Sequence, residues 1–444
     1  MNNVKVDFSD ITGKIKCINA VNNGPAGSRL QTTGNFQSYK ELEIPYARLH
    51  DASFYAGNYG GEFSVDVHRV FPNFDADEND PDSYVFAPTD SYLLDIESVN
   101  TKIFYRLGAS IEHGYKKGTY PPKDFLKWAR ICEHIIRHYT EGWADGFTHD
   151  IEYWEIWNEF DLYLDGGINP CWQGTIPQFY DFYCTVTKYL KEKFPSLKIG
   201  GPASSDGKNE KVIGDFLEEV KKQGAPLDFF SYHWYGVDIN KLVDFMRGVN
   251  EVLDRHGFGD TPVFLNEWNY SRSGEAGYSM NALKTHKGAS FVGAVMSAGQ
   301  REKLDMLMYY DARPTAWNGI FGSYGVLYKP YYTFLAARDM VRLGDCARCE
   351  CDEDLYVIAA TNGEDSALFL TYYKDEEENE DKAVRIEISG AKHGECVKAE
   401  FYLINEKCDL ELVREEYFTS DKFAIITKMK NYDTYLIKLI RESV

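Results

Sequence analysis

Short apolar segments alternate with segments of helical period over most of the chain, from about residue 14 to residue 335. Eight apolar segments are predicted to be β-strands because they are short and rich in β-branched and aromatic residues. They are residues 14–19, 46–50, 102–107, 153–157, 198–201, 228–233, 263–266 and 305–310. Strands that alternate with helices favour a parallel sheet, and eight such units favour a (β/α)8 TIM barrel, an α/β fold.

The segments between these strands support the barrel prediction. In residues 124–139 and 240–256, apolar side chains recur at helical spacing, and the second segment ends at Gly257, a residue type favoured at helix C-termini. A long stretch, residues 51–101, follows the second predicted strand. Because loops of this kind lie on the C-terminal face of a barrel, we expect this stretch to help build a pocket.

After about residue 340 the pattern changes to closely spaced strands without helices between them. The predicted strands are residues 355–360, 367–373, 383–389, 397–404, 423–430 and 434–440. This pattern predicts an all-β sandwich, which the alternating segment 4–8 is expected to join. We therefore expect a barrel domain of residues 14–338 and a sandwich domain of residues 1–13 plus 339–444. The acidic run 375–381 is expected to be a solvated hairpin loop.

Two predicted strands end in an Asn-Glu pair beside tryptophan. Residues 153–159 are YWEIWNE, ending at Glu159, and residues 263–268 are VFLNEW, which places Glu267 before Trp268. The two glutamates follow the fourth and seventh strands, so their carboxyl groups are expected to converge across the barrel mouth. Paired carboxylates are what glycoside hydrolysis requires, and Trp268 is a candidate substrate-binding residue because a tryptophan face is suited to stacking on a sugar ring.

Other predicted strands also end in polar residues, which are expected at the same barrel mouth. Alternation places Arg48 and His50 on one side of the second strand, and His233 and Tyr235 on one side of the sixth. An Arg48 that faces the barrel interior requires an anionic partner, and Glu267 is the expected one. Contact with Arg48 would keep Glu267 ionised. The alternative is a salt bridge between Arg48 and another residue of the barrel. Tyr235 is expected to orient Glu267.

Sugar contacts are expected from three further places. His233 is a candidate for binding sugar hydroxyl groups, and Trp317 is a candidate stacking platform after the eighth strand. Asp311 or Arg313 could bind a hydroxyl or carboxylate group. Barrel-interior packing is the simpler interpretation for His233 and Tyr235.

Composition and charge limit the kinds of molecule that the protein is expected to bind. The formal charge of −21 makes nucleic acid an unfavourable partner, and it also disfavours a strongly anionic polysaccharide. The chain contains no apolar run long enough for a membrane span and no secretory signal pattern at its start, so we expect a cytoplasmic protein. Nine cysteines, an odd number without a disulfide framework, favour a reducing compartment. A homo-oligomer is compatible with the sequence.

Two motifs suggest metal sites only superficially. Cys346, Cys349 and Cys351 form a cluster, but no second Cys or His pair stands nearby at ligand spacing. The acidic run that starts at Asp75 has Asp80 where a calcium loop of the EF-hand type needs glycine. We therefore expect no metal and no organic cofactor.

The order Arg48-x-His50, Trp157-Asn158-Glu159, His233-x-Tyr235 and Asn266-Glu267-Trp268 resembles glycoside hydrolase clan A, and most closely family 39. The resemblance covers roughly residues 14–330, and the family has a similar accessory sandwich. It implies Glu159 as acid/base, Glu267 as nucleophile and Asn158 as a ligand of the sugar 2-hydroxyl group. Phe160 stands where many clan members have proline, and Asp51 stands where xylosidases of the family tend to have glycine, so the sugar is not fixed by the resemblance.

The expected reaction is a double displacement on oligosaccharides or glycosides, in an exo-acting enzyme similar to β-xylosidases. The acid Glu159 requires a raised pKa, which the charge of Glu267 would supply. Carboxyl groups about 5–5.5 Å apart would indicate retention of configuration. Alternatives are a retaining endo-glycanase, an arabinosidase, a galactosidase, a transglycosidase or a non-catalytic carbohydrate-binding protein.

Overall fold

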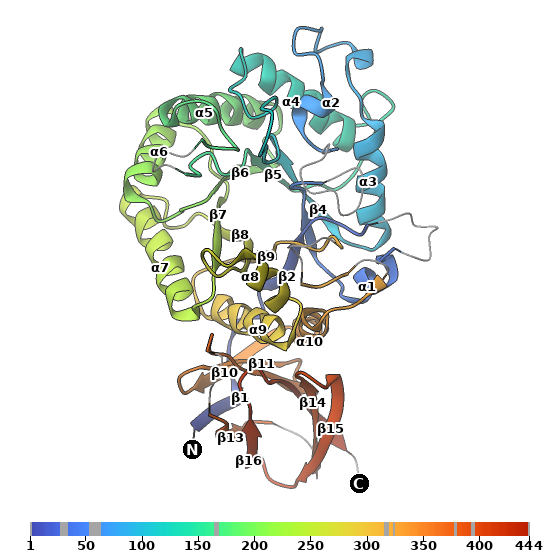
Figure 1. The fold of residues 1–444 in the computed structure, drawn as a ribbon, viewed down its shortest axis with the longest axis vertical. Helices are drawn as coiled ribbons and strands as arrows, with labels where there is room; N and C mark the ends of the chain where they lie inside the picture. The colour runs from blue at the N-terminus through green and yellow to red at the C-terminus, as the bar shows by residue number, and fades with distance from the viewer. Residues whose placement is uncertain are drawn as a thin grey trace.

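The computed structural model describes residues 2–26, 34–52, 64–163, 168–314, 319–322, 325–376, 380–391 and 396–442. Eight parallel strands close into a barrel in chain order, with helices around it, as predicted (Figure 1). The strands are β2 (Cys17–Asn22), β3 (Tyr46–Arg48), β4 (Lys102–Leu107), β5 (Tyr153–Ile156), β6 (Lys198–Ser204), β7 (Phe230–Gly236), β8 (Val263–Tyr270) and β9 (Met306–Tyr309).

Helices follow the strands and bury their apolar faces against the barrel. They are α1 (Phe36–Glu41), α2 (Val67–Val70), η1 (Pro81–Ser83), α3 (Ala87–Ser98), α4 (Phe125–Thr140), α5 (Ile176–Lys193), α6 (Glu210–Gln223), α7 (Ile239–His256), α8 (Ala276–Ala282), α9 (His286–Arg301) and α10 (Lys329–Leu343). Gly257 caps α7 with φ +85°, as the sequence predicted. No helix in the described part of the chain has the length and apolar character needed to cross a bilayer.

The barrel interior has an apolar floor and a polar layer above it. Phe104, Tyr153, Phe229 and Phe264 pack ring against ring at the amino ends of the strands, with centroid separations of 5.0–6.0 Å. Two residues further along the same strands the buried side chains are polar: Arg106, Glu155, Ser231 and Asn266. The apolar floor therefore closes one end of the barrel and leaves chemistry to the carboxyl end.

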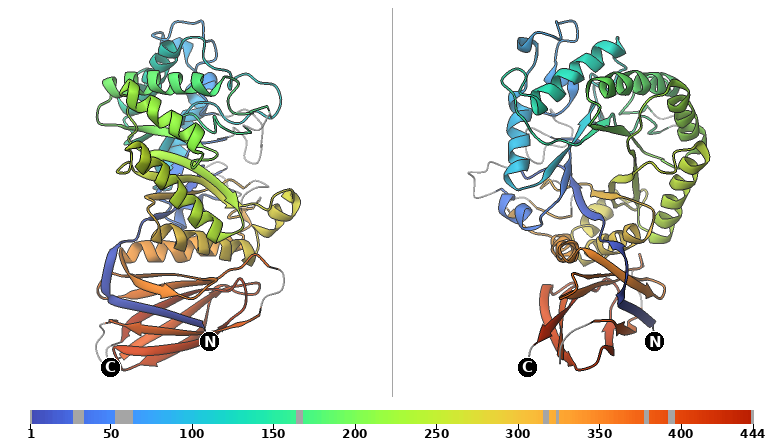
Figure 2. Two further views of the ribbon diagram at one scale, coloured as in Figure 1. Left: turned by 90° about the vertical axis from the view of Figure 1, so that its left-hand side faces the viewer. Right: turned by 180° about the vertical axis from the view of Figure 1, so that it is seen from behind.

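The C-terminal strands form one sheet that folds back on itself, so its two halves enclose a second core as a sandwich does (Figure 2). The sheet order is β15-β14-β17-β12-β11-β10-β1-β13-β16. Its strands are β1 (Asn2–Lys14), β10 (Asp345–Cys351), β11 (Leu355–Thr361), β12 (Ser366–Tyr372), β13 (Lys382–Ser389), β14 (Cys396–Ile404), β15 (Asp409–Phe418), β16 (Lys422–Met429) and β17 (Thr434–Glu442). The two edges meet where Phe418 stacks on Phe423 at 4.1 Å between centroids.

The predicted role of the amino-terminal segment is confirmed. Strand β1 lies between β10 and β13, antiparallel to the first and parallel to the second, and appears in blue among the orange and red strands of Figure 2. Val4, Val6 and Phe8 face the sandwich core, and the side chains between them face outward. The strands β10 and β15 were not predicted, because both are rich in charged or cysteine residues.

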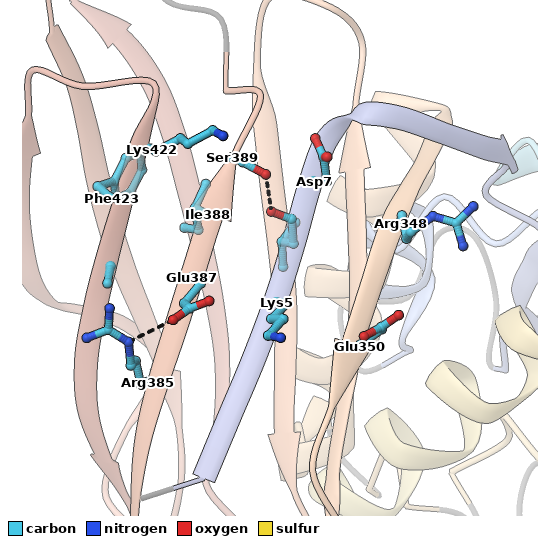
Figure 3. Close-up of a pocket in the computed structure, with 12 residues that line it drawn as sticks. Lys5, Asp7, Arg348, Glu350, Arg385, Glu387, Ile388, Ser389, Lys422 and Phe423 are labelled. Carbon is cyan, nitrogen blue, oxygen red and sulfur yellow. Dashed lines mark hydrogen bonds and ion pairs between the residues drawn. The ribbon is translucent and has the colours of Figure 1, made fainter.

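The outer face of β1, β10, β13 and β16 is hollowed, with a volume of about 660 Å³ (Figure 3). Charged side chains of both signs line it; Arg385 Nε donates to Glu387 Oε1 at 2.9 Å, and Lys5 and Asp7 project from β1. This hollow lies on the sandwich and shares no lining residue with the cavity at the barrel mouth.

The acidic run after β12 is not simply a solvated loop, contrary to the prediction. Asp375 reaches the barrel, where its Oδ1 lies 2.6 Å from Lys287 Nζ of α9 and its Oδ2 lies 3.0 Å from Arg272. Tyr270, at the end of β8, donates its hydroxyl hydrogen to Asp375 Oδ1 at 2.9 Å. The first residue of the run therefore joins the sandwich to the carboxyl end of a barrel strand.

Candidate active site

A cavity of about 310 Å³ opens at the carboxyl ends of the barrel strands. It is lined by His50, Asp51, Glu159, Tyr235, Glu267 and Tyr310, together with neighbouring residues. The two glutamates singled out from the sequence therefore share one cavity. This is the end of a barrel at which catalytic side chains are found.

A β-bulge aims Glu267 into this cavity. Along the β7–β8 pair, Leu265 lies opposite Tyr232, but Glu267 lies opposite His233, so Asn266 is the extra residue. A bulge interrupts the alternation of side chains, which lets two successive residues face the same side. Asn266 and Glu267 accordingly both make interior contacts, Asn266 with Glu155 and Glu267 with Arg48.

Glu159 reaches the cavity from the turn after β5. Its backbone is left-handed, with φ +43°, and its amide donates to Ala203 O at 2.8 Å. A non-glycine residue in this region is uncommon and is often found at functional sites. Its side chain is nearly buried, and its Oε1 lies 2.8 Å from His233 Nδ1.

The two carboxyl groups lie close together. One carboxylate oxygen of each glutamate and one ring nitrogen of His233 all lie within 4.8 Å of one another. Retaining glycosidases hold their carboxyl groups about 5–5.5 Å apart, whereas inverting enzymes need roughly 6.5–9.5 Å to admit a water molecule. An oxygen–oxygen approach within 4.8 Å fits the shorter separation better than the longer one.

A buried guanidinium supports the site from below. Arg48 has no exposed surface; its Nε donates to Glu155 Oε2 at 2.6 Å and its Nη1 donates to Glu267 Oε2 at 3.1 Å. The predicted contact with Glu267 is present, but the shorter contact is to Glu155. Glu155 was not predicted as a site residue, although a charged side chain inside the buried strand Trp154-Glu155-Ile156 was a visible signal.

Asn158 belongs to the same network. Its Oδ1 accepts a hydrogen bond of 2.7 Å from Arg48 Nη2, and its side chain is fully buried. Its Nδ2 lies 4.0 Å from the Sγ atom of Cys171. The amide is therefore held in place by the barrel, as a group that orients a sugar needs to be.

Tyr235 and His233 both contact the glutamates. The Tyr235 hydroxyl donates to Glu267 Oε1 at 2.5 Å, which places it where the sequence predicted. His233 was expected to contact sugar hydroxyl groups, but its ring lies between the two carboxyl groups, with Nε2 3.6 Å from Glu267 Oε2. His50 lies at the cavity wall and is 3% exposed.

The prediction that Trp268 binds substrate is wrong. The residue after the bulge points out of the barrel, has no exposed surface and packs against Phe291 of α9 and Tyr309. Trp317 lies outside the described residues. Asp311 and Arg313 bond to each other and are buried beside the cavity.

The surroundings of the two carboxyl groups affect their pKa values differently. Burial, with the charge of Asp161, raises the pKa of Glu159 to about 8. Burial also raises the pKa of Glu267, but Arg48 and the Tyr235 hydroxyl oppose this by direct contact. The predicted rise for Glu159 is present, yet its main cause is burial rather than the charge of Glu267. Burial lowers the pKa of His233 to about 4, so its ring is neutral near pH 7.

Comparison with known proteins agrees with this geometry. Residues 75–305, just over half of the chain, match the sequence model of "Glycosyl hydrolases family 39". The chain is 24% identical to a beta-xylosidase of Caldicellulosiruptor saccharolyticus over 52% of this chain and 47% of the relative, so it spans about half of that protein's length. It is 23% identical to a beta-xylosidase of Geobacillus stearothermophilus over 73% of this chain and 68% of the relative.

Solved structures give the same fold over the whole chain. A glucosidase from Croceicoccus marinus superposes with a TM-score of 0.82, at 21% identity and with full coverage of both chains. The fold agreement therefore includes the C-terminal sheet as well as the barrel, and the family match lies across the barrel strands that carry Glu159 and Glu267. The chain belongs to glycosyl hydrolase family 39.

Proposed function

We propose that the protein is a retaining glycoside hydrolase in which Glu159 is the acid/base and Glu267 is the nucleophile. The observation that carries this proposal is the approach of the two carboxyl groups to within 4.8 Å in one cavity. Their surroundings differ in the way that the two roles require. Arg48 and Tyr235 each donate a hydrogen bond to Glu267, and neither donates one to Glu159.

In the first step, ionised Glu267 attacks the anomeric carbon while Glu159 gives its proton to the departing oxygen. A pKa of about 8 keeps Glu159 protonated at neutral pH. When the neutral ring of His233 carries its proton on Nδ1, it donates to Glu159 Oε1, and Oε2, which lies 3.9 Å from Cys171 Sγ, carries the transferable proton. The sugar is then an ester of Glu267, and the leaving alcohol departs with that proton.

In the second step, the Glu159 carboxylate takes a proton from water, and the water oxygen attacks the anomeric carbon. The bond to Glu267 breaks, so both carboxyl groups return to their initial states and the configuration is retained. Arg48 and Tyr235 stabilise the departing carboxylate of Glu267, because each makes a hydrogen bond to one of its oxygens.

We further propose an exo-acting enzyme, similar to β-xylosidases, for oligosaccharides or glycosides. The cavity volume of about 310 Å³ is near the lower end of the range for small-molecule sites, which favours one terminal sugar over a long glycan cleft. Two relatives carry the name beta-xylosidase, and a similar structure is a glucosidase. A glucosidase, arabinosidase or galactosidase activity is therefore the second candidate.

The test is hydrolysis of aryl glycosides by the wild type and by Glu267→Ala. The panel contains β-xyloside, β-glucoside, β-galactoside, α-L-arabinoside and α-L-iduronide. Activity on one member, lost in the variant and rescued by azide with an inverted product, supports the nucleophile assignment. Equal activity in the variant contradicts it, and transfer to an added alcohol distinguishes a transglycosidase. If the wild type binds sugars but hydrolyses none, the protein is a carbohydrate-binding protein.

We also propose a reducing, cytoplasmic environment. All nine cysteines are free thiols, and several, such as Cys132 and Cys171, are fully buried. Fractionation of the native host, followed by thiol counting under denaturing conditions, tests this. Fewer than nine free thiols in the purified native protein would contradict it.

A further inference from the structure

Asp51 presents an unused carboxylate oxygen in the wall of the catalytic cavity. The residue follows β3, lines the cavity and is 1% exposed. Its Oδ2 accepts a hydrogen bond of 2.8 Å from the Tyr310 hydroxyl, whereas its Oδ1 has no hydrogen-bond partner among the described residues. A buried carboxylate oxygen without a donor is costly, so a ligand that supplies the donor gains that free energy on binding.

Hydrogen bonds hold the backbone of Asp51, and the Tyr310 hydroxyl holds its carboxylate. Asp51 has φ +53°, its carbonyl oxygen accepts from Arg313 Nη1, and its amide donates to Ser110 Oγ at 3.3 Å. The Arg313 guanidinium also bonds to Asp311, which occupies it. The orientation of the Asp51 carboxylate is therefore set before any ligand enters.

The imidazole of His50 lies beside the Asp51 carboxylate, so the cavity wall offers a possible hydrogen-bond donor next to an acceptor. Its Nε2 lies 3.4 Å from Asp51 Oδ1 without hydrogen-bond geometry, and its Nδ1 has no hydrogen-bond partner among the described residues. Both residues line the same cavity as Glu159 and Glu267. A sugar hydroxyl group both donates and accepts, so it matches a carboxylate oxygen placed beside an imidazole.

We propose that Asp51 determines sugar specificity: it accepts a hydrogen bond from a hydroxyl group of the terminal sugar, and its negative charge disfavours sugars that carry a carboxylate elsewhere on the same ring. This inference rests on the proposed glycosidase function and names the substrate class as neutral sugars. A site built to bind a hydroxyl group rejects an analogue that lacks it, because its buried polar group is then left unpaired. A uronic acid places a second anion beside a buried one.

The first test compares the wild type with Asp51→Asn, a substitution of the same size that suits a positive φ. The substrates are the 4-nitrophenyl glycoside that the wild type hydrolyses fastest and its 3-deoxy and 4-deoxy analogues. We expect kcat/KM of the variant to fall about 10- to 100-fold on the parent, and this loss to disappear on one deoxy analogue. The same loss on the parent and on both analogues overturns the proposal.

Asp161→Asn is a matched control. Asp161 is also a buried carboxylate near Glu159, but it does not line the cavity, and it bonds to Ser204 Oγ at 2.6 Å and the Ser205 amide at 2.8 Å. We expect any loss in this variant to be equal on the parent and the deoxy analogues. A loss that vanishes on the same analogue as for Asp51→Asn would overturn the assignment to Asp51.

The second test measures the ratio of kcat/KM for 4-nitrophenyl β-glucuronide to that for the β-glucoside. We expect Asp51→Asn to raise this ratio at least about tenfold, because it removes a fixed negative charge. An unchanged ratio overturns the exclusion of acidic sugars. The ratio depends on the sugar, so a general loss of folding or of catalysis does not change it.

Failure of the glycosidase proposal can be distinguished from failure of the Asp51 proposal. A wild type inactive on every glycoside, with no azide rescue in Glu267→Ala, contradicts the glycosidase proposal alone. In that case Asp51 is tested by calorimetric titration of free xylose and free glucose. Weaker binding by Asp51→Asn than by the wild type supports the hydroxyl contact, and equal binding or no binding by either protein overturns it.

Discussion

Arg48 Nη1 donates to Glu267 Oε2 at 3.1 Å in the interior of the barrel, where Arg48 has no exposed surface. A guanidinium keeps its charge at any ordinary pH, so this contact always favours the ionised form of its partner. Glu159 accepts no hydrogen bond from an arginine among the residues that the structure describes; its Oε1 lies 2.8 Å from Nδ1 of the neutral His233 ring. One fixed positive charge thus makes two buried glutamates chemically different.

The first prediction concerns the pH dependence of catalysis. Glu159 is active as an acid only while protonated, and burial raises its pKa to about 8, so activity should persist through neutral pH and fall as the pH rises through about 8. The acidic limit should lie above pH 4.5, because burial raises the pKa of Glu267, which must be ionised. A profile of kcat/KM against pH measures both limits.

Glu159→Gln is the control for this assignment. With a dinitrophenyl glycoside, whose leaving group needs no proton, the variant should keep its acidic limit and lose its alkaline one. An alkaline limit near pH 8 that persists in the variant would assign that limit to another group. His233 is not expected to set either limit near neutrality, since burial lowers its pKa to about 4.

The second prediction concerns Tyr235. In Tyr235→Phe, Glu267 loses the 2.5 Å hydrogen bond to its Oε1, which stabilises the ionised form. We expect kcat/KM to fall about 10- to 100-fold, in line with a hydrogen bond to a charged group, and the acidic limit to move to higher pH. Tyr232→Phe is the control, because that side chain lies on the outer side of the same strand. A fall in kcat/KM without any shift of the acidic limit would argue against a contact with ionised Glu267.

The third prediction concerns stability. Glu155→Gln removes the closest anion from the fully buried Arg48, which is expected to lower the free energy of unfolding by about 3–5 kcal/mol. Glu251→Gln makes the same chemical change at an exposed pair with Arg255 and should leave the unfolding midpoint unchanged. Urea unfolding of both variants beside the wild type measures the difference. Equal midpoints in all three proteins would show that Arg48 does not need Glu155.

The barrel was predictable because each strand is a short apolar run between amphipathic helices, but the carboxyl ends of β2, β6, β7 and β8 were placed too early. Strand β7 extends to Gly236 and β8 to Tyr270, beyond the predicted ends. Several of their last residues, such as Tyr235, Glu267 and Asn269, are polar and line the cavity, and polar residues weaken the apolar signal by which a strand is recognised.

The site residues were predictable where the residue type and its place at a strand end indicate the role. They were not predictable where a bulge or a contact between distant parts of the chain determines which way the side chain faces. Both Glu267 and Trp268 were expected in the cavity, although strict alternation permits only one of them. The bulge at Asn266 selects Glu267, and no sequence pattern announces a bulge of this kind. Asp375 was missed because its partner Lys287 lies 88 positions earlier in the chain, on a helix that only the fold brings near.

The fourth prediction concerns metal ions. Glu159, His233 and Glu267 offer three donor atoms within 4.8 Å of one another, a set that a zinc ion can use. The proposed reaction instead needs a proton on Glu159, so we expect a chelator to leave activity unchanged and added zinc to inhibit. Inhibition should strengthen as the pH rises toward about 8, because the metal competes with that proton. Activation by zinc would contradict the proposed mechanism.

The fifth prediction concerns the contact between the two domains. Lys287 is 6% exposed, lies 2.6 Å from Asp375 and sits 5.2 Å from the ring centres of both Tyr278 and Tyr432. In Asp375→Asn this ammonium group stays buried without its carboxylate, so we expect a loss of about 3 kcal/mol in unfolding free energy, the lower end for such pairs.

The effect of Asp375→Asn should depend on pH in one direction. Burial alone would raise the pKa of Asp375, but hydrogen bonds from Lys287 and Tyr270 outweigh it and the pKa is lowered. A lowered pKa means that the stabilisation is present above the unfolded value of about 4 and is lost as the pH falls below it. Wild type and variant should therefore differ in urea midpoint at pH 7, and this difference should be smaller at pH 3. Asp381→Asn, which removes an exposed pair with Lys428, should match the wild type at both pH values, and a constant difference between wild type and Asp375→Asn would contradict the ion pair as its cause.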